Sequence, residues 1–446
     1  MLRYFQLILQ VVLVLLVNDA TQEKMFSEVP ICFDIINCNV CHHNGMLLNV
    51  TESYSIFLSH LDIQNLSLVG IWENAFKNLT TTGLSFAEGN QISVVKKECF
   101  RGLPELSLLS LDNNLVPLSR HLFAELGGLT WLSLKNNSID SIPEDTFAGL
   151  SNLRKLSLGF NRITAIRSNF FLIPSLYKLD LNNNEIIEVP PYAFSALTQL
   201  AFLNLEHNKL QKNFTTDSFR GLNQLISLSL NNNNITSVSG GIFRHLVKLF
   251  ILLLGHNQIG ILEPGTFKNL SHLRSLFLQH NKLTHLTVGI FDGLTELRNI
   301  YIYNNYLQNI TADVFRGLNN LQSLSLNENR ITSVTGSPFR DLVKLEELLL
   351  QQNEISTLEP GTFQGLSRLT YLNLSNNKLS YIVVGLFAGM FEMQSLDLSY
   401  NNIYTIDPGA VANLINLHNI ILVGNNVTEI AMKCPVLLKS AMQSAS

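Results

Sequence analysis

The stretch LSLLSLDNN at residues 106–114 contains the pattern that decides how this chain folds. The pattern, L-x-x-L-x-L-x-x-N, occurs fourteen times, and only isoleucine or methionine ever replaces a leucine. From Leu225 onward it recurs every 24 residues. Its asparagine is present in every copy, at Asn114, Asn137, Asn161, Asn184, Asn208, Asn233, Asn257, Asn281, Asn305, Asn329, Asn353, Asn377, Asn401 and Asn425. Self-similarity at such a period is typical of a solenoid.

Apolar residues in each repeat are spaced to bury one side of the unit. The x-L-x-L-x segment alternates with period two, which predicts a short strand lying parallel to the same strand of the next repeat. A phenylalanine near position 19 completes the set, at Phe76, Phe100, Phe123, Phe147, Phe171, Phe194, Phe219, Phe243, Phe267, Phe291, Phe315, Phe339, Phe363 and Phe387. One repeat cannot bury this face alone, so stacked repeats must share a continuous core.

The asparagine at position 9 ends each strand. Its amide both donates and accepts hydrogen bonds, so it can satisfy backbone groups of adjacent turns that would otherwise be buried without partners. We therefore expect it to be structural and to have no binding role.

Composition and motifs exclude several classes of function. Charged residues make up only 14% of the 446 residues and the formal net charge is −4, so no basic field attracts nucleic acid. No glycine-rich phosphate loop, zinc-ligand spacing or nucleophile elbow is present. His256 and His280 share position 8 in adjacent repeats and should stack, but two ligands are too few for a structural zinc site. We expect no catalysis, no cofactor and no metal.

The first residues predict export from the cell. Residues 1–20 carry Arg3 and then a mostly apolar run from Tyr4 to Val17, which is typical of a secretory signal peptide. The alternative, a membrane anchor, would need a longer apolar run. No later segment is long and apolar enough to span a membrane, so we expect a secreted, extracellular protein.

The remaining chain is expected to divide into three parts. Residues 21–57 show no repeat and should form an N-terminal cap, and residues 58–433 should form a solenoid of about sixteen repeats. The first two repeats are degenerate, and Asn90 of the second lies one residue out of step. Residues 434–446 form a short tail and an incomplete cap.

Five cysteines fit an oxidising compartment, but an odd number cannot all pair within one chain. Cys32, Cys38 and Cys41 precede the repeats and are the disulfide candidates of the cap, with their connectivity left open. Cys99 and Cys434 lie far apart along the solenoid and should not reach each other. Either of them, if unpaired, could link two chains into a disulfide-bonded dimer.

A second, longer period is also visible. VKLFILLLGHNQIGILEPGTF at residues 247–267 returns as VKLEELLLQQNEISTLEPGTF at residues 343–363, an offset of four repeats. A tandem duplication of a four-repeat block is the simplest account.

The repeat unit resembles the 24-residue leucine-rich repeat of extracellular animal proteins such as Slit, Toll-type receptor ectodomains, chaoptin and serum carrier subunits. The resemblance covers about residues 58–433. It implies an α/β solenoid, a horseshoe with a parallel β-sheet on its concave side and an irregular or short-helical convex side, which binds protein ligands on the concave face or its flanking loops. This cap has three cysteines where family caps usually carry four, and no cysteine-rich closing module follows the last repeat.

Outward positions 3, 5, 7 and 8 are where a binding function should be encoded, because the core does not dictate them. Most hold serine, asparagine or aspartate. One block differs: Ile251, Leu253, Phe277, Tyr301 and Tyr303 should form a contiguous apolar and aromatic patch beside the two histidines. Such patches commonly mark partner surfaces, although drift in a permissive repeat is the alternative.

A second binding candidate is basic. Lys135, Lys155 and Lys178 follow one another in successive repeats, near Trp131 and Phe160. This strip could meet an acidic partner, or it is a solvated face.

Ten N-x-S/T sequons provide candidate glycosylation sites, at Asn49, Asn65, Asn78, Asn136, Asn213, Asn234, Asn269, Asn309, Asn373 and Asn426. A chain this rich in Asn, Ser and Thr would carry several by chance. A glycan on Asn373, at position 5, would deny part of the concave surface to a ligand.

Two functions fit these features. The first is a secreted, non-catalytic protein that binds an extracellular protein partner through its concave face. The second is a truncated ectodomain of a Toll-like or adhesion-type membrane receptor whose anchor is missing from this sequence.

Overall fold

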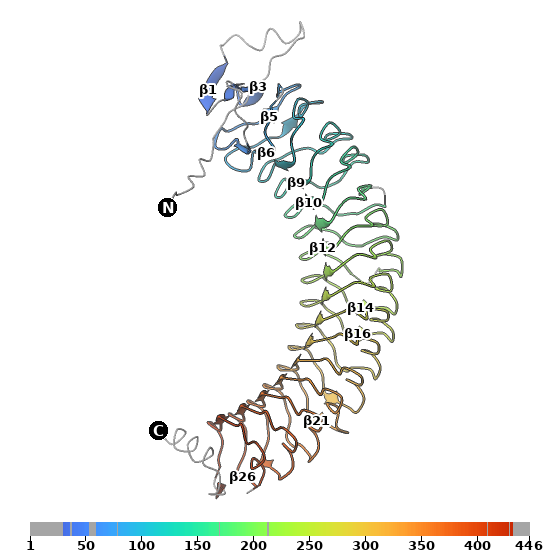
Figure 1. Ribbon diagram of the computed structural model, residues 1–446, viewed down its shortest axis with the longest axis vertical. Coiled ribbons are helices and arrows are strands. Elements are labelled where there is room, and N and C mark those ends of the chain that lie inside the picture. The colour runs from blue at the N-terminus through green and yellow to red at the C-terminus, as the bar shows by residue number, and fades with distance from the viewer. Residues whose placement is uncertain are drawn as a thin grey trace. The chain divides into compact units, whose positions relative to one another are not determined.

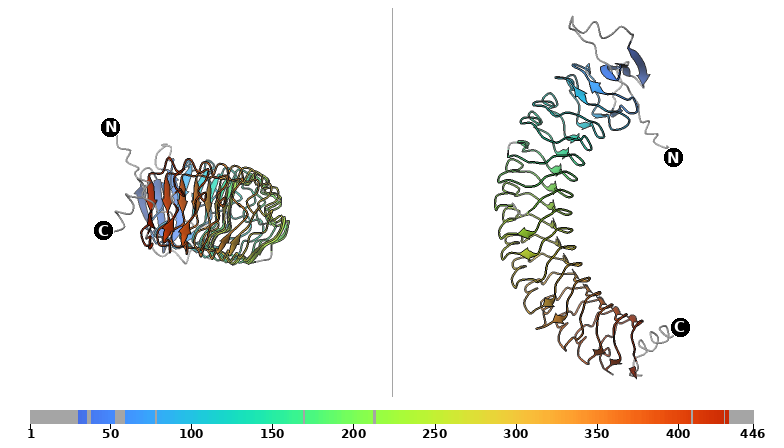
Figure 2. Two further views of the ribbon diagram at one scale, coloured as in Figure 1. Left: turned by 90° about the horizontal axis from the view of Figure 1, so that it is seen from below. Right: turned by 180° about the vertical axis from the view of Figure 1, so that it is seen from behind.

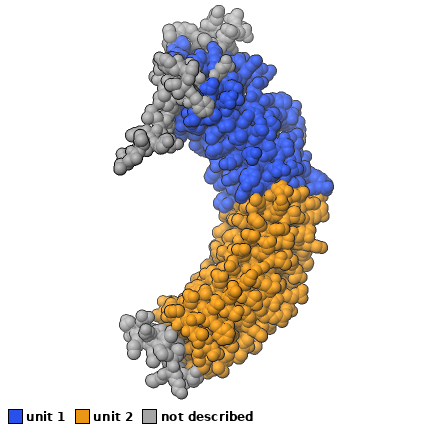
Figure 3. Space-filling view, in the orientation of Figure 1, with its two compact units in different colours: residues 1–209, 220–222 blue, residues 210–219, 223–446 orange. Residues whose placement is uncertain are grey.

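The computed structural model describes residues 30–35, 38–52, 59–77, 79–168, 170–211, 214–407, 409–427 and 429–430. The predicted signal peptide and the C-terminal tail with Cys434 lie outside this range. The chain divides into two compact units, unit 1 with residues 1–209 and 220–222, and unit 2 with residues 210–219 and 223–446 (Figure 3). Each unit is a coil of stacked turns (Figures 1 and 2).

The x-L-x-L-x segments form the predicted parallel strands, one for each turn. In unit 1 these are β4 (Leu61–Asp62), β6 (Gly83–Ser85), β8 (Leu108–Ser110), β9 (Trp131–Ser133), β10 (Lys155–Ser157), β11 (Lys178–Asp180) and β12 (Phe202–Asn204). In unit 2 they are β13 (Ser227–Ser229), β15 (Ile251–Leu253), β17 (Ser275–Phe277), β18 (Asn299–Tyr301), β20 (Ser323–Ser325), β22 (Glu347–Leu349), β23 (Tyr371–Asn373), β25 (Ser395–Asp397) and β27 (Asn419–Ile421). Within each unit the coil bends toward this sheet, which therefore lines the concave side (Figure 1).

The convex side is irregular, as predicted, and its residues lie mostly in turns. It carries short parallel pairs, β14 (Ser237–Val238) with β16 (Ile261–Leu262) and β19 (Asn309–Ile310) with β21 (Ser333–Val334). A third group contains β24 (Tyr381–Ile382), β26 (Thr405–Ile406) and β28 (Glu429–Ile430). The described residues contain no helix, so the short-helical alternative is not realised there. None of them therefore supplies a helix long and apolar enough to cross a bilayer.

The phenylalanines form the predicted spine of the core. Successive rings stack with centroids 5.8–6.4 Å apart from Phe76 to Phe194 in unit 1, and from Phe219 to Phe243 and from Phe267 to Phe387 in unit 2. Most of these rings are almost completely buried, as are the leucines at positions 1, 4 and 6. Aromatic pairs at this spacing add stabilisation beyond the burial of their area.

The asparagine at position 9 joins adjacent turns as predicted. Asn281 is buried; its Oδ1 accepts a hydrogen bond from the Ile259 N–H (2.9 Å), and its Nδ2 donates to the carbonyls of Leu254 (2.9 Å) and Leu278 (3.1 Å). Asn90, out of step in the sequence, makes equivalent bonds to Leu68 and Ile63. The degenerate second repeat therefore keeps the asparagine hydrogen bonds that join adjacent turns.

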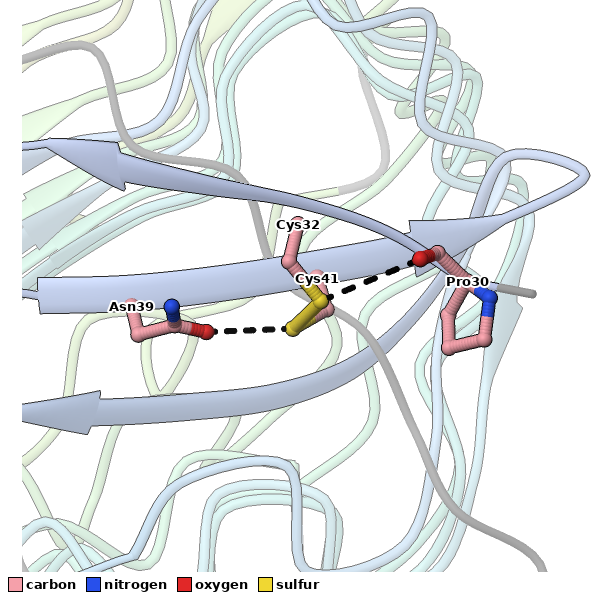
Figure 4. The surroundings of a disulfide bond; sticks show 4 residues. All are labelled: Pro30, Cys32, Asn39 and Cys41. Carbon is pink, nitrogen blue, oxygen red and sulfur yellow. Dashed lines mark hydrogen bonds between the residues drawn. A yellow bond between two sulfur atoms is a disulfide. The ribbon is translucent and has the colours of Figure 1, made fainter.

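The region before the repeats contains an antiparallel sheet. β1 (Ile31–Ile35), β2 (Cys38–His43) and β3 (Met46–Glu52) pair in sequence order, and β3 continues in parallel into β5 (Gly70–Ile71) and β7 (Val94–Val95). Cross-strand neighbours Cys32 and Cys41 form a disulfide (Figure 4). Of the three pairings left open by the sequence, this is the one present.

Cys99 is buried in the core of unit 1 with 1% of its surface exposed. Burial raises the pKa of its thiol far above the ordinary value, so the thiol stays protonated at neutral pH. A disulfide to a second chain requires an accessible thiolate. In the folded state, Cys99 is therefore a poor candidate for the hypothetical dimer link, which would fall to Cys434, outside the described residues.

Candidate protein-binding surface

The five residues of the predicted patch, Ile251, Leu253, Phe277, Tyr301 and Tyr303, lie together on the concave side of unit 2; we call them the aromatic patch. In-register pairing of β15, β17 and β18 places Leu253, Phe277 and Tyr301 side by side in one row. Tyr303 follows β18 by two residues. The parallel register explains this contiguity, because equal repeat positions become neighbours across the sheet.

The rings of the patch are ordered by stacking. Phe277 and Tyr301 stack with centroids 4.6 Å apart and an angle of 20° between the rings. His256 and His280 stack at 4.2 Å, and His280 meets the edge of Tyr303 at 5.3 Å. Two rows of ring contacts therefore lie side by side, one with Phe277 and Tyr301 and the other with His256, His280 and Tyr303.

The described residues contain no group of three or more His, Cys, Asp or Glu side chains placed to hold a metal ion.

The patch is a surface and not a closed pocket. Ile251 is 37% exposed, and the other four side chains are half-buried. Half-buried, stacked rings lose little side-chain entropy when a partner covers them, which favours binding.

The two histidines share a left-handed backbone conformation with the asparagines that fill the same position in other repeats. Position 8 is left-handed along the solenoid, with φ of 54° at His256 and 53° at His280, and Asn136, Asn232 and Asn304 fill the same position in other repeats. Asparagine, aspartate and histidine are all enriched in this conformation. Histidine at position 8 is therefore compatible with the backbone, and the two rings also stack on each other.

Gly255 and Gln279 are in contact beside the rings, where the Gln279 amide lies close to the Gly255 backbone. This pair was not identified from the sequence. Gln279 is 9% exposed, and its side-chain amide fills the space where a Cβ on Gly255 would lie, 2.6 Å from Nε2. Its Oε1 receives no hydrogen bond from the described residues. A glycine at position 7 followed by an amide at position 7 of the next repeat is the signal. Gly159 and Asn182 repeat it in unit 1.

The duplicated block provides an internal reference for the patch. Four repeats later, the positions of Ile251, Phe277, Tyr301 and Tyr303 are occupied by Glu347, Asn373, Asp397 and Ser399, and only Leu253 has an apolar counterpart, Leu349. Both copies form the same strands with the same register. The fold therefore does not require the aromatic residues of the patch.

The hydroxyl of Tyr301 has a raised pKa. Burial raises the pKa of its hydroxyl, and the negative charge of Glu347 and the neighbouring Tyr303 raise it further. The phenol therefore stays neutral at physiological pH and can both donate and accept hydrogen bonds.

The basic strip of unit 1 is partly neutralised. β9, β10 and β11 place Trp131, Lys155 and Lys178 side by side. The Nζ of Lys155 lies 5.6 Å from the Trp131 ring, and that of Lys135 lies 3.8 Å from Asp180. Phe160 is 54% exposed at position 8. Since one of the three lysines is paired and another lies over an aromatic ring, this strip presents less free charge than the sequence suggests.

The described sequons lie mostly away from the patch. Exposed asparagines are Asn65, Asn136, Asn234, Asn269, Asn309 and Asn426, whereas Asn49 and Asn373 are half-buried, and Asn78 and Asn213 lie outside the described residues. Asn269 lines a groove outside the concave strands, together with Val247, His272 and Ile290. Asn373 lies on β23, where its amide bonds to the Tyr371 hydroxyl and the Ser375 N–H.

Comparison with known protein families agrees with the repeat pattern. The leucine rich repeat model matches residues 112–163, 151–210, 212–259, 252–307, 295–355, 319–379 and 344–390, and a second model of that description matches 392–414. These matches cover more than half of the chain, and none is to an enzyme family. The comparison with curated protein sequences finds no match.

Solved structures with similar folds come from bacteria and animals. A leucine-rich-repeat protein of Leptospira interrogans is 26% identical with a TM-score of 0.64, over 81% of this chain and 89% of that one. A chain of the glycosylated Toll–Spatzle complex of Drosophila is 20% identical with a TM-score of 0.66, over 94% of this chain and 57% of that one. An internalin of Listeria monocytogenes is 21% identical with a TM-score of 0.52, over 81% and 86%. At their identities, the latter two show the fold alone.

Proposed function

Because the chain belongs to the leucine-rich repeat family, we propose that it is an extracellular, non-catalytic binding protein that holds a protein partner on the concave strands of unit 2. The observation that supports this is the aromatic patch, which interrupts a face that is otherwise mostly polar. Aromatic side chains dominate the binding energy of protein interfaces. The equivalent strands of the duplicated block keep the same fold without them, so a role in folding does not explain their presence.

The position of the sequons agrees with this proposal. No sequon falls on a strand position of β13, β15, β17, β18, β20 or β22, while Asn234, Asn269 and Asn309 are exposed elsewhere in the same repeats. Glycans at these asparagines would leave the aromatic patch open. The Cys32–Cys41 disulfide fits an oxidising compartment.

The test replaces three rings by the residues found four repeats later: Phe277→Asn, Tyr301→Asp and Tyr303→Ser. We expect the variant to capture at least about tenfold less partner from native extracellular fluid than the original chain, because hot-spot aromatics are lost. Its thermal midpoint should change little, because these residues already occur in the same fold. Tyr301→Ser is avoided because it would create a sequon with Asn299.

A matched control makes the same three changes at exposed aromatic residues elsewhere, Phe391→Asn, Tyr381→Asp and Tyr192→Ser. The control should retain capture. Equal capture by the original chain and the patch variant, with the patch variant folded, would exclude this surface as the binding site.

A second candidate function is that of a receptor ectodomain. The similarity to Toll in the Toll–Spatzle complex extends over 94% of this chain, and the chain spans 57% of the Toll chain. Sequencing the transcript past Ser446 tests this reading. A downstream apolar segment of spanning length is expected if it is right, and the intact protein free in extracellular fluid is expected if the chain is a carrier.

A further inference from the structure

We propose that the partner of the aromatic patch presents a lysine or arginine side chain, which lies between the Tyr301 ring and the Glu347 carboxylate. This inference rests on the proposed function and adds the charge of the partner segment. Four features carry it: the sign of the charges on the concave strands, their lack of basic partners, the orientation of the Tyr301 ring and the small residues beside it.

The concave positions of unit 2 carry only negative formal charge. In every repeat from Leu225 to Gly424, positions 3, 5, 7 and 8 contain no lysine or arginine, while Glu328, Glu347 and Asp397 occupy three of them. The same positions of unit 1 include Lys135, Lys155 and Lys178. Charge of one sign along a concave face attracts a partner of the opposite sign.

The three carboxylates accept hydrogen bonds only from neutral donors within the described residues. Glu347 accepts from the Ser323 hydroxyl (2.8 Å), Glu328 from the Asn304 amide (3.1 Å), and Asp397 from the Ser399 hydroxyl (2.6 Å). None of them has a lysine, arginine or histidine within ion-pair distance in the described chain. Their negative charge is therefore available to a partner.

Ion pairs between neighbouring repeats are common outside the concave positions of the same unit. Arg274 pairs with Glu296 (3.1 Å), Lys378 with Glu354 (2.7 Å), and Arg316 with Asp292 (3.6 Å). Arg274, which precedes β17, also lies over the Phe250 ring at 4.6 Å. The same repeats therefore form ion pairs outside the concave positions but provide no cation for the carboxylates on the concave strands.

The geometry beside the patch fits one cationic side chain. Phe277 covers one face of the Tyr301 ring, so the other face is directed along the sheet toward Ser325, the strand partner of Tyr301. Ser325 is small and buried, and its own strand partner is Leu349, so the row continues from Tyr301 through Ser325 to Leu349. On the far side of β20, Glu347 is the strand partner of Ser323. Tyr301 on β18 and Glu347 on β22 are two strand spacings apart, about 10 Å, and their positions differ by two residues, about 7 Å along the strand, so their backbones lie about 12 Å apart.

A lysine or arginine matches this arrangement in both parts. Its apolar stem can lie against the ring, and its charged head can reach the carboxylate, combining a cation–π contact with a charge-assisted hydrogen bond. The raised pKa of the Tyr301 hydroxyl agrees with this, because the charge of Glu347 contributes to it after burial, which is the larger cause. A neutral or acidic partner would leave the carboxylate uncompensated as water is excluded.

The experiment selects a displayed random peptide library against the purified full chain and measures the enriched peptides, made synthetically, by fluorescence polarisation. We expect enriched peptides to carry lysine or arginine. The variant Glu328→Gln with Glu347→Gln should weaken their binding about fivefold, because the exposed ion-pair contact is lost while the Tyr301 ring remains. The control Glu359→Gln with Glu392→Gln removes the same charge outside the concave positions and should bind within about twofold of the original chain.

The outcomes separate this inference from the proposed function. Neutral or acidic peptides that bind the charge variant normally but not the Phe277→Asn, Tyr301→Asp, Tyr303→Ser variant would overturn the inference and support the patch. Peptides indifferent to both variants, or no enrichment at all, would overturn both. As a check that needs no variant, raising NaCl from about 50 to 500 mM should weaken the original complex, because exposed charge pairs are screened.

Discussion

Asparagine occurs at both position 8 and position 9 of many repeats, but for different physical reasons. At position 8, asparagine is favoured because the backbone is left-handed, as at Asn304 with φ of 54°. At position 9, it is required because its amide bonds buried backbone groups of two turns, as at Asn305. Position 8 can therefore change to histidine at a modest cost, whereas position 9 does not change.

The hydrogen bonds of the position 9 asparagines predict that loss of a single side-chain amide lowers the stability of the fold. Asn281→Ala removes the partner of the buried Ile259 N–H and one of the two amide donors to the Leu254 carbonyl, the other being Asn257, and should lower the apparent free energy of unfolding by about 1–3 kcal/mol. Urea unfolding followed by circular dichroism measures this. Asn299→Ala is the control, because that half-buried amide bonds only to the Ser275 hydroxyl, and it should cost less than about 1 kcal/mol. Equal losses in the two variants would contradict the structural role of position 9.

At the scale of elements, each turn is stabilised by its neighbours. A strand of three residues has too few hydrogen bonds and too little buried surface to persist alone. The stacked leucines and phenylalanines supply the missing burial, and the strands are parallel because each turn of the coil returns in the same direction. The phenylalanine spine is thus the convex counterpart of the concave sheet.

The spine predicts a contrast between two phenylalanines of unit 2. Phe291 is 1% exposed and stacks between Phe267 and Phe315, so Phe291→Ala should cost about 3–5 kcal/mol through lost burial and an unfilled cavity. Phe391 is 54% exposed, and Phe391→Ala should change stability by less than about 0.5 kcal/mol. Thermal and urea unfolding of the two variants compare them directly. A small effect at Phe291 would show that neighbouring turns repack without the ring.

At the scale of the molecule, the duplication separates scaffold from surface. Residues 247–267 and 343–363 have the same residues at the leucine and phenylalanine positions of the core, whereas most concave positions of the two blocks hold different residues. Nearest-neighbour stacking permits this, because each repeat contacts only the adjacent repeats and whole blocks can be inserted without disturbing distant turns.

This modularity predicts that one block can be removed. Deleting residues 249–344 joins Lys248 to Leu345 in register, so the shortened chain should keep its far-UV circular dichroism per residue and unfold cooperatively. It should also lose partner capture, because the aromatic patch is gone. Deleting residues 249–332 instead removes three and a half repeats and should give a poorly folded chain. Similar spectra and melting of the two deletions would contradict stacking in register.

The candidate site was predictable from the sequence in part. Equal repeat positions become neighbours in a parallel sheet, so the contiguity of Phe277, Tyr301 and Tyr303 followed from counting. Gly255 and Gln279 were missed, because a missing Cβ matters only once the adjacent side chain is placed. Likewise, Lys135 read as a free charge until the structure placed it beside Asp180.

The repeat pattern of this sequence alone determined the parallel sheet, the buried leucine and phenylalanine layers and the role of the position 9 asparagines. Those features follow from period and residue chemistry, because every unit must bury the same face and satisfy the same backbone groups. The tertiary structure decided the disulfide between Cys32 and Cys41, the burial of Cys99, the stacking of the patch rings and the lack of basic partners for Glu328 and Glu347. These depend on the packing and distances of particular side chains, which periodicity does not encode.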